Sequence, residues 1–196
     1  MQEVNNKNFN HLKIHTQYSI CEGAIKIDDL KNFCKENKIR SLGLSDTSNL
    51  CGSLEFSENI SKSGTQPIIG TQISFNFNGH IGLLPLIAKT EIGYKNIVEL
   101  SSKSYLNSGE TLDPECDFDD LLKKSNDIII FSGGINGLIG KLFIKGKFLE
   151  IEDIYKKIKD KFKDNFYVEV QRHNDENEKA FENYNLNLSS KLEIPL

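Results

Sequence analysis

The most constraining segment of the chain is Phe9-Asn-His11-Leu-Lys13-Ile-His15-Thr-Gln-Tyr18-Ser19-Ile-Cys21-Glu22-Gly23. Its first part alternates apolar and polar residues up to His15, which is the pattern of a half-buried strand, and a loop with Ser and Gly follows. A short strand that ends in histidine and leads into such a loop is typical of a barrel that brings polar side chains to its mouth. Lys13 interrupts this set of potential metal ligands, because an ammonium group has no lone pair with which to bind a cation.

Composition and charge exclude several classes of protein. The chain has 196 residues, 38% hydrophobic and 27% charged, which fits one globular domain with a sizeable core. A net charge of −4 provides no overall basic field for nucleic acid, so any DNA contact would be local or made by another part of a longer protein. No apolar run reaches membrane-spanning length and the polar N-terminus lacks the apolar stretch of a signal peptide, so we expect a cytoplasmic protein without a membrane partner.

The hydrophobic pattern predicts alternating strands and helices. We predict strands over residues 11–15, 41–45, 67–75, 80–88, 127–131 and 166–170, and helices over 27–34, 54–63, 93–106, 149–162 and 176–192. Residues 76–79, Asn-Phe-Asn-Gly, are a hairpin turn signal, residues 108–117 a loop, and residues 194–196 the start of a further strand. Such alternation predicts an α/β fold with a largely parallel sheet.

Cysteines and the lysine-rich helix have simple interpretations. Cys21, Cys34, Cys51 and Cys116 form no C-x-x-C pair, and we predict reduced structural thiols, with Cys34 on the apolar face of a helix. The helix that carries the lysines between positions 156 and 163 also contains Asp153 and Asp160, which favours a solvated face over a DNA site.

Six ordered motifs resemble those of the PHP domain, in the form found in the alpha subunit of bacterial DNA polymerase III. The first is the segment from Phe9 to Gly23. The others are Leu42-Gly-Leu-Ser-Asp46-Thr-Ser-Asn49-Leu-Cys-Gly52, Pro67-Ile-Ile-Gly70-Thr-Gln72, Leu86-Ile-Ala-Lys-Thr-Glu-Ile-Gly93-Tyr94-Lys-Asn96-Ile, Ile130-Phe-Ser132-Gly133-Gly134 and Phe166-Tyr-Val-Glu169-Val-Gln171-Arg172-His173. The resemblance covers essentially the whole chain, and the family's next motif, A-T-N-D-x-H-Y, would follow Leu196.

The resemblance implies a fold and a parent protein. The fold would be an incomplete, distorted (β/α)7 barrel, with residues 1–196 forming the N-terminal part of the PHP domain, truncated before its last βα units. The parent would be a DNA-directed DNA polymerase whose magnesium-binding aspartates lie in a domain outside this chain. Expected partners are the rest of the alpha subunit, DNA through the full-length protein, and a separate proofreading exonuclease subunit for which the PHP domain is the docking surface.

An intact PHP site binds up to three divalent metals through His, Asp, Glu and sometimes Cys, and uses them to hydrolyse phosphoesters. Here Lys13 and Thr47 replace histidines of the family pattern, Gln72 replaces an acidic residue, Gly134 replaces a cysteine used by some members, and Leu83 lies near a further histidine position. His15, Glu22, Asp46 and His173 remain. The vestigial metal-site positions are therefore Lys13, His15, Glu22, Asp46, Thr47, Gln72, Gly134 and His173, and we expect no metal, no cofactor and no catalytic residue in this chain.

The remaining residues have structural interpretations. We expect His15 to bond a backbone carbonyl, His173 to be solvated or structural, and the ammonium of Lys13 to pair with Asp46 in the space of the former cation. Gly52, Gly70 and Gly133 are predicted to serve tight turns.

Two alternatives remain open at this point. An active metal-dependent phosphoesterase or 3'–5' proofreading exonuclease would need the missing ligands to be replaced from elsewhere in space. A free-standing adaptor domain would have no polymerase attached, which the full length of the gene would reveal.

Overall fold

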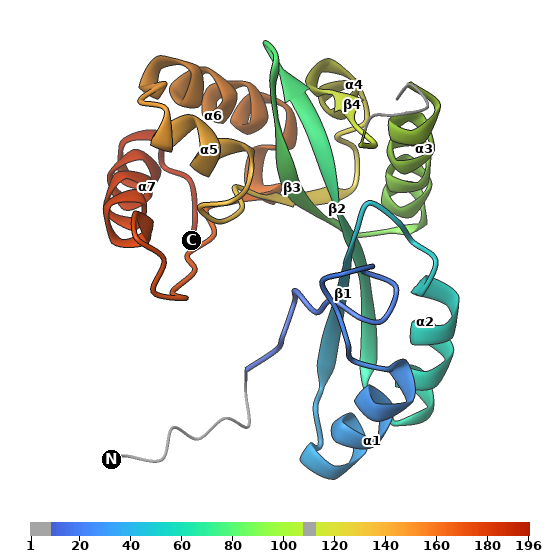
Figure 1. The fold of residues 1–196 in the computed structure, drawn as a ribbon. Coiled ribbons are helices and arrows are strands. Elements are labelled where there is room, and N and C mark those ends of the chain that lie inside the picture. Colours follow the sequence, from blue (N-terminus) through green and yellow to red (C-terminus); the bar gives the residue numbers. More distant parts are fainter. Residues whose placement is uncertain (1–8, 108–112) are drawn as a thin grey trace, which may run out of the picture. The chain divides into compact units, whose positions relative to one another are not determined.

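The computed structural model describes residues 9–107 and 113–196. Residues Met1–Thr71 and Gln72–Leu196 form two compact units, which are considered separately below. Figure 1 shows the elements of both units. Part of the loop predicted over 108–117, residues 108–112, lies outside the described residues.

The first unit contains α1 (Ile27–Asn37), β1 (Ser41–Thr47), α2 (Ser53–Lys62) and the start of β2 (Gln66–Phe77). The predicted helices and strands at these positions are confirmed. Both helices are amphipathic, and their apolar faces share one core with β1. The buried members of this core are Ile27, Leu30, Cys34, Leu42, Leu44, Phe56 and Ile60.

Residues 11–15 form no regular strand, so the strand predicted there is wrong. The segment makes only isolated parallel bridges, of which Ile14–Leu44 joins it to β1. The backbone N–H of Ile14 donates to the Gly43 carbonyl at 3.1 Å, and that of Ser45 donates to the Ile14 carbonyl at 2.8 Å. A Cβ on Gly43 would lie 2.5 Å from the Leu12 carbonyl oxygen, so glycine is what lets the segment approach β1 so closely.

The second unit is built on the hairpin of β2 and β3 (His80–Ala88). The predicted turn is confirmed, because Asn78 and Gly79 both have positive φ, as a two-residue type I′ turn requires. In Figure 1, α3 and α4 lie on one side of this hairpin and α5, α6 and α7 on the other. The remaining elements are α3 (Glu91–Asn107), β4 (Cys116–Asp117), α4 (Phe118–Lys123), β5 (Ile128–Phe131), α5 (Leu138–Ile144), α6 (Phe148–Phe162), the 3₁₀ turn η2 (Lys163–Asn165), β6 (Phe166–Tyr167) and α7 (Glu178–Leu192).

The sheet of the second unit is mixed and open, so the prediction of a largely parallel sheet is wrong. Its strand order is β2-β3-β5-β6, with β4 also paired to β2. The β3–β5 pair is antiparallel, whereas β2–β4 and β5–β6 are parallel. The long hairpin makes β2 and β3 antiparallel neighbours, so the sheet cannot be wholly parallel.

The C-terminal residues pack onto β6. The backbone N–H of Val168 donates to the Pro195 carbonyl at 2.8 Å, and Ile194 is 4% exposed. Ser189 Oγ donates to the Ile194 carbonyl at 2.6 Å. Residues 194–196 therefore lie beside the end of β6 but form no regular strand, so the strand start predicted there is wrong.

Candidate functional site

Asp46, at the end of β1, is the centre of a buried hydrogen-bond network in the first unit. Its side chain is fully buried. Oδ1 accepts from the backbone N–H of Thr16 at 2.6 Å and from the Ser19 hydroxyl at 2.7 Å. Oδ2 accepts from the Thr16 hydroxyl at 2.8 Å. Three donors from one loop thus satisfy a carboxylate that would otherwise be buried at high cost.

The same loop holds Glu22 and His15 beside Thr47. The Thr47 hydroxyl donates to Glu22 Oε2 at 2.5 Å, and the Thr47 backbone N–H donates to Ser19 Oγ at 3.1 Å. His15 Nδ1 lies 3.6 Å from Glu22 Oε2 and 3.3 Å from Ser19 Oγ. The structure thus brings His15, Glu22, Asp46 and Thr47 together around Ser19, which sequence reasoning had not assigned.

Tyr18 and Asn49 close this loop. The Tyr18 hydroxyl donates to Glu55 at 2.6 Å, and this hydrogen bond is the main reason that the pKa of Tyr18 is raised. Asn49 Nδ2 donates to the Tyr18 carbonyl at 2.9 Å. A Cβ on Gly52 would lie 2.7 Å from the Tyr18 ring, so Gly52 is needed for space and not for a tight turn.

The other two glycine predictions have different outcomes. Gly133 has a φ of +76°, which confirms the backbone requirement at this position. Gly70 lies inside β2, so the turn predicted there is wrong.

Asp46 accepts hydrogen bonds from Thr16 and Ser19. The pairing of its carboxylate with the Lys13 ammonium, expected from the sequence, stays a prediction.

These donors do not fit a metal site. Both oxygens of Asp46 already accept hydrogen bonds, and Glu22 is bound by the Thr47 hydroxyl. Across residues 9–107 and 113–196, no group of three or more His, Cys, Asp or Glu side chains has a geometry that could hold a metal ion. Transition-metal sites need three or four such donors at once.

The remaining predicted positions lie in the second unit. Gln72 is a buried residue of β2, at 6% exposure. Gly134 follows β5, and a Cβ there would lie 2.0 Å from the Gln171 amide oxygen. His173 is exposed, as expected for a solvated or structural residue, and its backbone N–H donates to both carboxylate oxygens of Glu178, at 2.8 and 2.7 Å.

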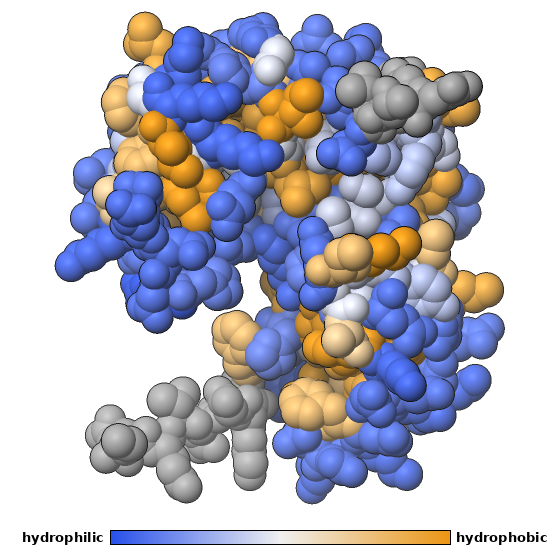
Figure 2. Space-filling model, in the orientation of Figure 1, coloured by the Kyte–Doolittle hydropathy of each residue, from blue (hydrophilic) through white to orange (hydrophobic). Residues whose placement is uncertain are grey.

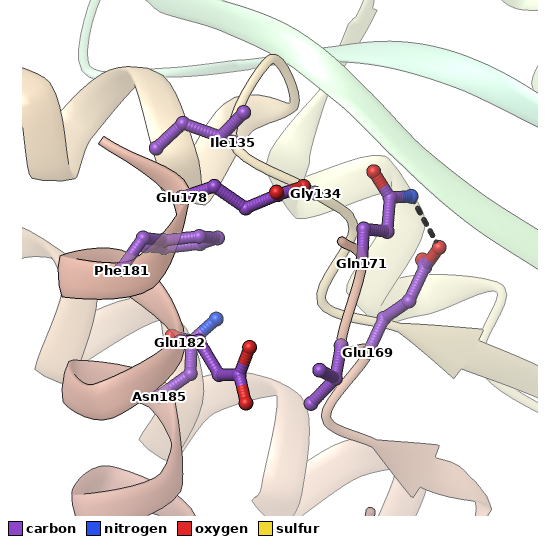
Figure 3. Close-up of a pocket in the computed structure, with 9 residues that line it drawn as sticks. Gly134, Ile135, Glu169, Gln171, Glu178, Phe181, Glu182 and Asn185 are labelled. Atoms are coloured by element: carbon purple, nitrogen blue, oxygen red, sulfur yellow. Dashed lines mark hydrogen bonds between the residues drawn. The ribbon is translucent and has the colours of Figure 1, made fainter. Parts of the chain in front are cut away.

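A small acidic pocket lies between the segment after β6 and α7 (Figure 3). Its volume of about 10 Å³ corresponds to a single water molecule. Its carboxylates are engaged: Glu178 accepts from the backbone of His173 and Asn174, and Glu182 forms a bidentate pair with Arg172 at 3.0 and 2.6 Å. The guanidinium of Arg172 lowers the pKa of Glu182. The pocket is lined by Gly134, Ile135, Glu169, Val170, Gln171, Glu178, Phe181, Glu182 and Asn185.

A buried polar network behind this pocket was not predicted. The Tyr155 hydroxyl donates to Asn185 Oδ1 at 3.0 Å, and both residues are almost completely buried. Ser132 Oγ accepts the Glu169 backbone N–H at 2.9 Å. Burial raises the pKa of Tyr155. The only sequence signal was the position of Tyr155 and Asn185 on the apolar faces of their helices.

All four cysteines are free. Cys34 and Cys116 are buried, whereas Cys21 and Cys51 are exposed, so the structural role predicted for all four holds only for the first two. Burial, with a smaller effect of Asp120, raises the pKa of Cys116 to about 11, so this thiol stays protonated at neutral pH.

None of the described helices combines the length and the apolar character needed to cross a bilayer.

Comparison with known proteins identifies similar sequences along the whole chain. The family model described as "PHP domain" matches residues 11–173. The DNA polymerase III subunit alpha of Caulobacter vibrioides is 35% identical over 100% of this chain and 18% of its own length. The corresponding subunits of Borreliella burgdorferi and Haemophilus influenzae are 34% and 33% identical over 96% of this chain. The chain spans 16–18% of the length of these relatives.

A solved structure shares the fold. The protein from Bifidobacterium adolescentis, crystallised as a candidate metal-dependent phosphoesterase, superposes with a TM-score of 0.50. It covers 94% of this chain and 84% of its own, at 12% sequence identity. This likeness concerns the fold alone, and it agrees with an α/β barrel type whose sheet is here left open.

Proposed function

The chain belongs to the PHP-domain family, and from this membership we propose that it is the N-terminal part of a bacterial DNA polymerase III alpha subunit. The identity of 33–35% to such subunits, over 96–100% of the chain, is the observation that supports this proposal. The full-length protein would be a cytoplasmic DNA-directed DNA polymerase. Its magnesium-binding aspartates would lie in the region that this chain does not span.

We further propose that this PHP domain is catalytically inactive. Lys13, Thr47 and Gln72 stand where the family pattern has metal ligands, and Gly134 stands where some members have a cysteine. The observation that supports the proposal is the engagement of Asp46: both of its carboxylate oxygens accept hydrogen bonds from Thr16 and Ser19, and these compete with a metal for the oxygen lone pairs. An incomplete ligand set leaves no activated water with which to cleave a phosphoester.

In place of catalysis, the domain would act as a scaffold. It would support the polymerase and provide the docking surface for a separate proofreading exonuclease subunit. An active phosphoesterase or intrinsic exonuclease is the competing function. It would require other residues to supply the metal ligands that are missing at Lys13, Thr47 and Gln72.

Metal content and phosphoesterase activity of the full-length protein test the proposal. We expect no stoichiometric manganese or zinc and no hydrolysis of a 3'-mismatched primer by the unaltered protein. The triple variant Lys13→His/Thr47→His/Gln72→Glu is the comparison, with circular dichroism as the control for folding. Stoichiometric metal with turnover in the unaltered protein would establish the competing function.

A second measurement tests the scaffold role. The purified exonuclease subunit of the same bacterium should bind the full-length protein, and removal of residues 1–196 should abolish the interaction. Retained binding after this removal would contradict the proposed docking role.

A further inference from the structure

The pocket between α7 and the segment after β6 is formed within one compact unit. All of its lining residues belong to Gln72–Leu196. Those on α7 include nearly buried ones, since Glu178 is 7% exposed, Phe181 4% and Asn185 1%. The volume of about 10 Å³ is close to the minimum that holds one water molecule. An occupant of this pocket is therefore a single small molecule or ion, with its ligands in this unit.

Three polar residues of α7 lie on the helix face that meets the segment after β6. Glu178, Glu182 and Asn185 follow one another at helical spacing, so they share one face of the helix. Glu178 accepts from the backbone N–H of His173, and Glu182 pairs with the side chain of Arg172. Of the three, Asn185 alone makes no direct hydrogen bond to this segment among the described residues.

The amide of Asn185 is satisfied on one side only. Its Oδ1 accepts from the Tyr155 hydroxyl at 3.0 Å. Its Nδ2 is buried and donates to none of the described residues. Figure 3 shows this nitrogen pointing from α7 into the pocket. Because native proteins satisfy nearly all buried donors, the pocket should hold an acceptor for Asn185 Nδ2.

The opposite orientation of the Asn185 amide does not remove this requirement. It would direct Oδ1 toward a pocket lined by the carboxylates of Glu178 and Glu182. Acceptors would then face acceptors, which is unfavourable without a donor between them. The orientation with Nδ2 toward the carboxylates is therefore the favoured one.

The groups that line the pocket select the chemical class of its occupant. An anion would face the carboxylates of Glu169, Glu178 and Glu182. A cation has no lone pair to accept from Asn185 Nδ2. Water has both lone pairs and hydrogens, and carboxylate oxygens that already accept one hydrogen bond can accept another. Figure 2 shows hydrophilic side chains at the surface around the loop that leads into α7, so water is available beside the pocket.

We propose that this pocket is a binding site for one ordered water molecule, which accepts from Asn185 Nδ2 and donates to the carboxylate oxygens of the pocket. The site is independent of the proposed function. The water joins α7 to residues 169–171 through hydrogen bonds, as Glu178 and Glu182 join α7 directly to residues 172–174.

A high-resolution crystal structure of the full-length protein tests the site. We expect a density peak about 2.7–3.2 Å from Asn185 Nδ2 and from at least one carboxylate oxygen of the pocket. A pocket without density would overturn the inference. Crystals soaked in a thallium salt distinguish water from a monovalent cation, because thallium has a strong anomalous signal. A thallium peak in the pocket would also overturn the inference.

Three variants test whether Asn185 Nδ2 holds the water. Asn185→Leu keeps the approximate size of the side chain but removes the donor, so the peak should disappear, since buried waters typically need about three hydrogen bonds. Tyr155→Phe removes only the hydrogen bond on the other side of the amide and should keep the peak. Asn187→Leu is the matched control, because Asn187 is exposed on the same helix, and it should keep the peak too.

The pattern among the variants decides the role of Asn185. A peak that persists in Asn185→Leu, or that disappears in Asn187→Leu as well, would show that Asn185 Nδ2 does not hold the ligand and would overturn the inference. If Asn185→Leu does not fold, the density in the unaltered protein decides the inference by itself.

Discussion

The hydrogen bonds of Asp46 predict a contribution to stability that can be measured without reference to any catalytic role. Its carboxylate accepts hydrogen bonds from the Thr16 backbone, the Thr16 hydroxyl and the Ser19 hydroxyl in a fully buried site. These hydrogen bonds connect β1 to the loop that follows residue 15.

Asp46→Ala should lower the free energy of unfolding by about 2–4 kcal/mol, because it leaves the buried donors of Thr16 and Ser19 without an acceptor. Asp46→Asn should lower it less, by about 1–2 kcal/mol, because one amide oxygen remains an acceptor. Urea denaturation followed by circular dichroism measures both. Equal losses in the two variants would contradict the account of Asp46 as an acceptor.

Asp120 makes the stability of the second unit depend on acid pH. Lys103 lies 2.8 Å and Lys123 3.5 Å from its carboxylate, and the hydrogen bond from Lys103 is the main reason that the pKa of Asp120 is lowered below 3.8. A lowered pKa in the folded state stabilises the protein above the unfolded value, and this stabilisation is lost as the pH falls through the folded pKa.

Asp120→Asn should therefore lower the free energy of unfolding by about 1 kcal/mol at pH 6. The difference from the unaltered protein should shrink as the pH falls below about 4 and through the lowered pKa of Asp120. Asp119→Asn is the control, because Asp119 is exposed and no ion pair with it is recorded among the described residues. A difference that does not change with pH would argue against the ion pair.

The composition of the candidate site could be predicted residue by residue, but its contacts could not. The positions of His15, Glu22, Asp46 and Thr47 follow from one motif and the end of one strand. The hydrogen bonds from Thr16 and Ser19 to Asp46 depend on where the loop turns, and the alternation of apolar residues does not predict the position of that turn.

At the scale of single elements, the start of α3 depends on one glycine. A Cβ on Gly93 would lie 1.9 Å from the Asp127 carbonyl oxygen. This oxygen also accepts the Lys89 backbone N–H at 2.9 Å, so it cannot move without breaking a hydrogen bond.

Gly93→Ala should destabilise the second unit by about 2–4 kcal/mol, because the clash is with backbone. Gly134→Ala is a comparison at a position where the clash is with the flexible end of Gln171, and it should cost about 1 kcal/mol or less. The midpoint of thermal denaturation should therefore be well above that of Gly93→Ala for Gly134→Ala. The opposite order would mean that the segment containing Asp127 is free to move.

The elements themselves were predicted where periodicity is long and flanked by turn residues. The five predicted helices and the hairpin of β2 and β3 are confirmed for this reason. The short helices α4 and α5 were missed, since six or seven residues give too few turns for a helical period to be recognised. The strand predicted over residues 166–170 is wrong beyond Tyr167, because Glu169 donates its N–H to the Ser132 side chain in place of a neighbouring strand.

At the scale of the whole molecule, charge argues against direct binding of DNA by this chain. Its net charge is −4, and several lysines of α6 pair with acidic residues of the same helix, for example Lys157 with Asp153 at 2.8 Å. Nonspecific DNA binding depends on lysine and arginine that are available to replace counterions.

The isolated 196-residue chain should therefore bind a 20-base-pair duplex at 150 mM salt more weakly than about 10⁻⁵ M, in the weak part of the usual nonspecific range. Fluorescence anisotropy with labelled duplex measures this, with circular dichroism as the check that the chain is folded. Micromolar binding with a steep dependence on salt would reveal a basic surface that the ion pairs of α6 do not neutralise.

The hydrogen bond between Val168 and Pro195 has a consequence for how the protein is made on the ribosome. Val168 leaves the exit tunnel 27 residues before its partner Pro195 does. At about 5–20 residues per second, the two events are separated by roughly 1–5 seconds. During that interval the nascent chain carries an unpaired strand end, which is a site for non-native strand pairing.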